Sequence, residues 1–155
     1  MNMHKHMLPD ETNSIEKVIE ILTLQLQLHK ELHGHTRELK EILTDNCNED
    51  LLCNKYEQRG LLINKIASLK KDYDSAKECV NSADNKGKAI TDKLLQEIQQ
   101  MLNSIVILDT ENIALLNTCI KDITYNLEKI QESKHFVNDL KKHISNSPVF
   151  VDVCG

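Results

Sequence analysis

Glycine, proline and aromatic residues are scarce in this chain of 155 residues, which has four glycines, two prolines, 3% aromatics and no tryptophan. The strands of β-sandwiches and barrels draw on aromatics and their turns on glycine and proline, so the composition argues strongly against these folds. So few glycines also leave little material for a phosphate-binding loop, and neither G-x-G-x-x-G nor G-x-x-x-x-G-K occurs. The composition therefore predicts an all-α protein, with one domain as the default for this length.

Strong positive charge and long apolar runs are also lacking. The net charge is −5, without a strongly basic segment, which argues against a nucleic-acid partner. No stretch approaches the roughly 20 apolar residues of a membrane span, and the N-terminus lacks the apolar run of a secretory signal. We therefore expect a cytoplasmic protein that does not insert into membranes.

The five cysteines, an odd number at irregular spacings, include no C-x-x-C pair. This pattern suits neither a disulfide framework nor a zinc site, so we expect reduced thiols. The small size of a thiol makes burial the expected state for Cys79 and Cys119. Cys154, expected to be exposed, is the candidate for a reactive thiol, but the sequence fixes no partner histidine for it.

The first expected helix starts at Asn13 or Ser14, where Asn13 and Glu16 can form a capping box. Gly34 weakens the middle of this helix and makes a bend there plausible. Apolar residues recur at steps of three, four and seven and predict one buried face. That face consists of Ile15, Val18, Ile19, Leu22, Leu26, His29, Leu32, Leu39 and Ile42.

A second helix is predicted after the turn at 44–48, because Asn48 precedes two carboxylates that favour a helix N-terminus. Its apolar residues alternate at steps of three and four, as in helices that pack lengthwise against neighbours. The stripe consists of Leu52, Tyr56, Arg59, Leu62 or Ile63, Ile66, Leu69, Tyr73, Ala76 and Val80. Residues 81–88 are rich in Asn, Ser, Asp and Gly and predict a loop.

From 89 to 144 no proline or glycine interrupts the helical pattern. A continuous helix of this length would reach about 85 Å, so the sequence allows either a rod or a helix broken near Asp109-Thr110, and it leaves both open. The predicted architecture is an elongated antiparallel bundle of three to four long amphipathic helices with a left-handed twist. We place a flexible segment at 1–13, the bundle at 14–145 and an apolar tail at 146–155.

The sequence contains no strong candidate for a metal-binding or catalytic site. His29 and His33 are spaced as two metal ligands on one helix face, with His35 nearby, but two ligands do not make a site, and solvated histidines are the better interpretation. We expect no metal, no cofactor and no catalytic residues, because no nucleophile–base or carboxylate set stands out.

Two polar residues in the apolar stripes are more informative. Asn112 lies between Leu108 and Leu115, where a polar residue either fixes register or partner choice or marks a boundary or hinge, and the sequence allows both interpretations. Arg59 is likewise a polar residue within an apolar stripe, and its long aliphatic stem can also carry the guanidinium outward to solvent.

The order of elements resembles that of the FlgN-type flagellar export chaperones. Three stretches carry the resemblance: the Leu/Glu-rich opening helix at Ile15–Leu32, the acidic turn leading into a helix at Asn48–Leu69, and LDTENIALL at Leu108–Leu116, which is similar to the family's Leu-x-x-x-Asn-x-x-Leu-Leu. Together they span most of 14–145, and only their order and spacing separate them from generic heptads. The histidine-rich start and the apolar tail are not expected of the family.

The resemblance implies a non-enzymatic chaperone that covers an amphipathic, partly disordered terminus of hook-filament junction proteins and delivers them to the flagellar export apparatus. It also implies a cargo-binding surface in the C-terminal helical region. On this chain that surface comprises Leu116, Ile120, Ile123, Leu127, Ile130 and Val137. The same periodicity suits a homodimeric coiled-coil structural or adaptor protein without flagellar cargo. A metal- or thiol-dependent enzyme is the third alternative.

Overall fold

The computed structural model describes residues 9–80 and 85–145, and side chains within 14–80 and 85–143. It contains three helices, α1 (Pro9–Asp45), α2 (Glu49–Glu78) and α3 (Asn85–Ser145), and no strand in the described ranges. The all-α prediction is confirmed for this part of the chain. The expectations for residues 1–8 and for the apolar tail at 146–155 lie outside the described residues.

Helix α1 begins at Pro9, not at Asn13 or Ser14, so the predicted capping box is wrong. Proline is favoured in the first turn of a helix because its φ angle is already helical and its missing N–H needs no partner there. The helix continues through Gly34 without interruption.

The turn between α1 and α2 follows the prediction. Asn48 caps α2, and its side-chain oxygen accepts a hydrogen bond from the Leu51 backbone N–H at 3.3 Å. Cys47 has a φ angle of 52°, and its N–H donates to the Ile42 carbonyl at 3.0 Å, which closes the end of α1. This short connection makes α1 and α2 neighbours that run in opposite directions.

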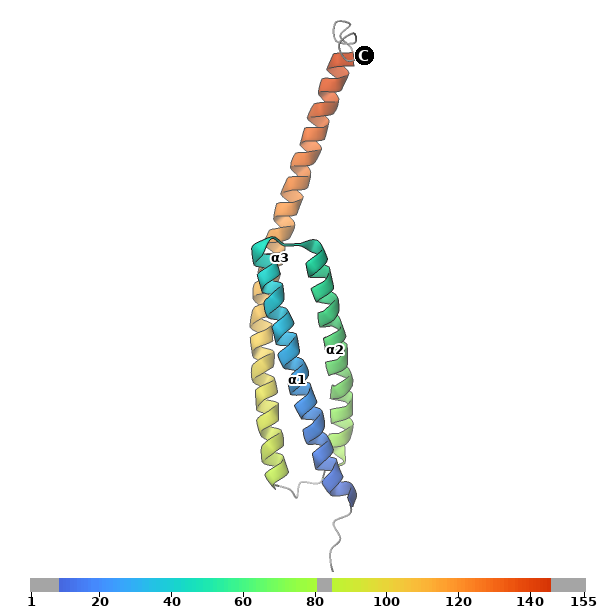
Figure 1. The fold of residues 1–155 in the computed structure, drawn as a ribbon, viewed down its shortest axis with the longest axis vertical. Coiled ribbons are helices and arrows are strands. Elements are labelled where there is room, and N and C mark those ends of the chain that lie inside the picture. The colour runs from blue at the N-terminus through green and yellow to red at the C-terminus, as the bar shows by residue number, and fades with distance from the viewer. Residues whose placement is uncertain (1–8, 81–84, 146–155) are drawn as a thin grey trace, which may run out of the picture. The chain divides into compact units, whose positions relative to one another are not determined.

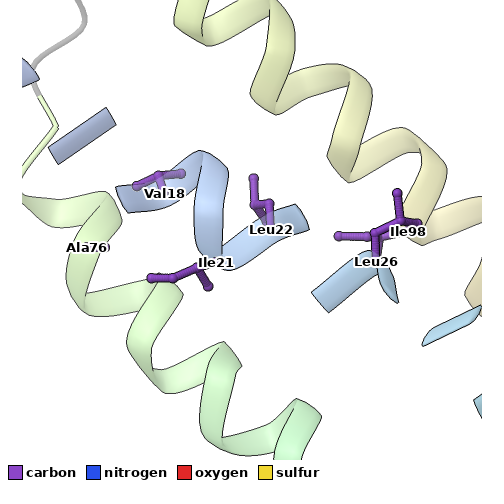
Figure 2. Close-up of a cluster of buried hydrophobic side chains, with 6 residues drawn as sticks. All are labelled: Val18, Ile21, Leu22, Leu26, Ala76 and Ile98. Carbon is purple, nitrogen blue, oxygen red and sulfur yellow. The ribbon is translucent and has the colours of Figure 1, made fainter. Parts of the chain in front are cut away.

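The chain divides into two compact units, 1–115 and 116–155. In the first unit, α1, α2 and the first part of α3 lie side by side (Figure 1). One buried cluster joins all three helices and is drawn in Figure 2: Val18, Ile21, Leu22, Leu26, Ala76 and Ile98. A second cluster continues the core along the same helices: Leu28, Leu32, Leu62 and Ile105.

The buried arc of α1 is wider than predicted, because α1 packs against both other helices of this unit. Among its buried residues, the sequence pattern missed Ile21, Gln25, Leu28, Thr36 and Leu43. On α2 most of the predicted stripe faces inward, but Tyr56 is 38% exposed. Of the alternatives Leu62 and Ile63, Leu62 is the buried one, at 7% exposed against 46%.

Helix α3 runs from Asn85 to Ser145 without a break at Asp109-Thr110. The side chains that suggested a break have other partners: the Asp109 carboxylate accepts from Arg59, and the Thr110 hydroxyl donates to the Val106 carbonyl at 2.9 Å. The predicted loop at 81–88 is also too long, because residues 85–88 already form the first turn of α3. In the second unit, the described residues belong to α3 alone.

Candidate functional site

The most prominent feature of the second unit is a row of exposed apolar side chains on α3. From Ile120 to His143 every side chain is exposed, and Leu116 is half-buried. Leu127 and Ile130, at the middle of the row, are 55% and 51% exposed. Together with two lysines that continue the same spacing, these residues form what we call the C-terminal seam, whose steps alternate between four and three residues: Leu116, Ile120, Ile123, Leu127, Ile130, Lys134, Val137 and Lys141.

The six residues that the family resemblance implies for cargo binding all belong to this seam, and they share one face of α3. Of the six, Ile120, Ile123, Leu127, Ile130 and Val137 are exposed. A contiguous apolar face of this kind on a protein surface marks an interaction site. The structure thus brings the predicted residues together on an accessible surface.

The same helix carries apolar residues at similar spacing in the first unit, where they are covered. Ile98, Ile105 and Asn112 follow one another at steps of seven residues and are buried against α1 and α2. Such repeats of three and four residues give a helix one continuous packing face. In the first unit the partner helices belong to the chain itself, while the seam of the second unit remains exposed.

A polar layer lies near the end of the first unit and consists of Arg59, Asp109, Thr36 and Asn112. The guanidinium of Arg59 donates from one nitrogen to both carboxylate oxygens of Asp109, at 2.8 and 2.9 Å. Asn112, which is buried, donates through its side-chain nitrogen to the Thr36 carbonyl at 3.0 Å. These bonds link α3 to α2 and to α1, so both polar residues of the stripes face inward.

Directed bonds of this kind fix the register of packed helices, because sliding one helix would leave buried polar atoms without partners. The bond of Asn112 fits the register alternative, and no hinge interrupts α3 at this position. Asn112 also lies close to the boundary between the two units, which falls after Leu115. Arg59 does not reach outward to solvent, since its side chain is only 12% exposed. Tyr56 beside this layer is 38% exposed, and its partial burial raises the pKa of its hydroxyl, a shift that Arg59 opposes and Asp109 reinforces.

A second polar contact joins α1 to α2. Lys55 forms an ion pair with Glu38 and donates a hydrogen bond to His35 Nδ1 at 3.1 Å. The hydrogen bond from Lys55 lowers the pKa of the Glu38 carboxyl. Because the Glu38 side chain is half exposed, water screens this pair, and it contributes little to stability.

His29, His33 and His35, the histidines considered as metal ligands, do not belong to a group of three potential ligands in the described part of the chain. His29 is buried, and its Nδ1 lies 2.6 Å from the Gln25 carbonyl; since a carbonyl only accepts, Nδ1 carries the hydrogen and donates. Burial of His29 confirms its place on the predicted buried face and contradicts its interpretation as a solvated histidine, because this bond satisfies the ring inside the core. Within the described residues, no group of three His, Cys, Asp or Glu side chains is placed to hold a metal ion.

Neither of the two cysteines that were expected to be buried is fully buried. Cys79 is exposed, not buried, because it forms the C-terminal cap of α2, where its N–H donates to the Ala76 carbonyl. Cys119 is half-buried. The prediction for Cys154 lies outside the described residues.

An open groove of about 340 Å³ lies between α1 and α3 in the first unit. Its lining includes His33, Glu41 and Ser104, residue types that occur in nucleophilic catalysis. The Ser104 hydroxyl, however, donates to the Gln100 carbonyl at 3.2 Å and makes no hydrogen bond to His33. The groove therefore shows no hydrogen-bonded nucleophile–base pair.

None of the three helices, over the residues that are described, combines the length and apolarity needed to cross a bilayer. Comparison of the chain with models of protein families, with curated proteins and with solved structures gave no match.

Proposed function

We propose that this chain is a cytoplasmic chaperone of the FlgN type, which binds the terminus of a hook-filament junction protein, prevents its premature assembly and aids its delivery to the flagellar export apparatus. The observation that carries the proposal is the exposed C-terminal seam, whose apolar residues recur at the spacing that an amphipathic helix requires of its partner. The resemblance of Ile15–Leu32, Asn48–Leu69 and Leu108–Leu116 to this family supplies the class of cargo.

In this proposal the two units have different tasks. The first unit is an antiparallel bundle with a left-handed twist that holds α3 by the polar layer and the two core clusters. The second unit offers the seam to a partly disordered cargo segment, which pays the entropy of ordering when it folds onto the helix. Binding of this kind needs no cofactor and no catalytic residue, so we propose that the chain is not an enzyme.

The test replaces Leu127 and Ile130 by aspartate in the full chain. Two buried carboxylates would face the cargo, so binding of a junction protein should weaken by at least about 100-fold. The helical signal in far-ultraviolet circular dichroism should persist, because both side chains are already exposed. The matched control is Tyr125→Asp with Phe136→Asp, two exposed apolar residues of α3 outside the seam, which should retain binding.

Binding is measured by capture of proteins from a lysate of the source organism, identification by mass spectrometry and light scattering of the complex. A junction protein held by the native chain and the control, and lost from the seam variant, would support the proposal. Retained binding in the seam variant would place the cargo surface elsewhere. Recovery of a stable homodimer alone would instead favour the coiled-coil structural or adaptor alternative.

A further inference from the structure

The C-terminal seam changes character along its length. From Leu116 to Ile130 it is entirely apolar, whereas Lys134 and Lys141 alternate with Val137 in its last part. The positions directly beside the seam carry no charge of either sign: Asn117, Cys119, Thr124, Asn126, Gln131, Ser133, Asn138 and Leu140. The only charges on this face of the helix are therefore two positive ones at its C-terminal end.

The chain itself provides no counter-charge for these lysines. Neither Lys134 nor Lys141 has an acidic residue three or four positions away on α3, and within the described part of the chain neither forms an ion pair. The acidic residues of this segment lie away from the seam: Asp122, Glu128, Glu132 and Asp139. If a partner without an opposite charge covers a lysine ammonium, the ammonium loses hydration and forms no ion pair, so binding is weakened.

A second copy of this chain does not meet that need. Two seams packed in parallel and in register would place Lys134 opposite Lys134 and Lys141 opposite Lys141, which is repulsive. An antiparallel pair would place each lysine opposite apolar or uncharged residues, because neither the seam nor its flanks contain a carboxylate. In both arrangements the two lysines stay uncompensated.

We infer that the occupant of the seam is an acidic amphipathic helix, with an apolar stripe for Leu116–Ile130 and carboxylates that pair with Lys134 and Lys141. This inference rests on the proposed function and specifies the chemistry of the cargo segment. The apolar part supplies most of the binding free energy, and the two lysines select the partner and its alignment, as charges at the edge of an interface do. A partner with basic residues at these positions is rejected.

Three fluorescein-labelled peptides test the inference against the full chain by fluorescence anisotropy. Each is a designed amphipathic helix of four heptads with leucine at positions a and d, and they differ only in having glutamate, glutamine or lysine at positions e and g. We expect the glutamate peptide to bind roughly tenfold or more tightly than the glutamine peptide, and the lysine peptide to bind most weakly. The glutamate preference should shrink as salt rises from about 0.05 M to about 0.5 M.

The variant Lys134→Glu with Lys141→Glu should reverse this order, so that the lysine peptide binds best. The matched control, Lys121→Glu with Lys129→Glu, makes the same change of net charge away from the seam and should keep the native order. A native order that survives in the seam variant, or reversal by the control as well, would show that overall charge decides and would overturn the inference.

The two proposals fail in different ways. Equal affinities for all three peptides would refute the acidic partner while leaving the seam as a cargo surface. Absence of binding to any peptide, with a chain that is monomeric by light scattering, would refute the seam as a docking surface altogether. A homodimer that dissociates when Leu127 and Ile130 become aspartate would identify a second copy as the occupant and overturn the inference.

Discussion

The ion pair between Arg59 and Asp109 makes an asymmetric prediction, because its two members differ in their access to water. The Arg59 side chain is 12% exposed and its Nε has no partner, whereas the Asp109 side chain is 35% exposed. Removing Asp109 therefore strands a buried guanidinium. Removing Arg59 leaves a carboxylate that water reaches.

We expect Asp109→Ala to lower the free energy of unfolding by about 3 kcal/mol, the cost of leaving a buried charge without its partner. Arg59→Met keeps the packing of the side-chain stem and leaves a hydrated carboxylate, so it should cost only about 1 kcal/mol. The double variant Arg59→Met with Asp109→Leu should lie within about 1 kcal/mol of the native chain, since apolar pairs can replace partly buried ion pairs.

Urea unfolding followed by far-ultraviolet circular dichroism measures these differences, provided that the m-value stays constant. The control is Lys40→Met, which breaks the ion pair of Lys40 with Glu111 between α1 and α3; both of its side chains are 45% exposed, and we expect a loss below about 0.5 kcal/mol. The reasoning would be refuted if Arg59→Met cost as much as Asp109→Ala, or if neither exceeded the control.

Two further predictions concern helix interiors and pH. Gly34 and Gly60 lie inside α1 and α2, and a Cβ added at either position would have no atom within 4 Å. Alanine at each should therefore raise the free energy of unfolding by about 0.5–1 kcal/mol, measured by urea unfolding. A lower free energy of unfolding in both variants would show that the open space is absent. Because Lys55 lowers the pKa of Glu38, the native chain should be more stable than Glu38→Gln above pH 4.5, by less than about 1 kcal/mol. This difference in stability should vanish as the pH falls through the lowered pKa. Thermal unfolding of both chains at pH 7 and pH 3 measures it, and an equal difference at both pH values would contradict the prediction.

Local patterns in the sequence were sufficient for much of the fold. Steps of three and four residues identified the inward faces of α1 and α2, and the polar turn at 44–48 located their connection, with Asn48 as the cap of α2. These features depend on side-chain period and on capping chemistry, which act between residues close in the chain. The predictions failed where two local signals competed, as at Pro9 against Asn13 and at residues 85–88.

For the C-terminal seam, too, local sequence and tertiary structure each decide a different property. The family resemblance grouped Leu116 to Val137 into one binding surface, and helical geometry places these side chains on one face. The same spacing in Ile98 and Ile105 belongs to a buried core. Periodicity is identical for a covered and an uncovered face, so only the placement of α1 and α2 beside the first part of α3 separates the two.

Composition and period by themselves determined that this chain is helical, where its apolar faces lie and where α1 gives way to α2. The tertiary structure decided which ambiguous polar residues are buried, because contacts between distant residues set that outcome. Arg59 faces inward only since Asp109, 50 residues away, offers it a carboxylate, and Asn112 is accommodated because Thr36, 76 residues away, offers a carbonyl. Such partners come from different helices, and no pattern within one helix contains them.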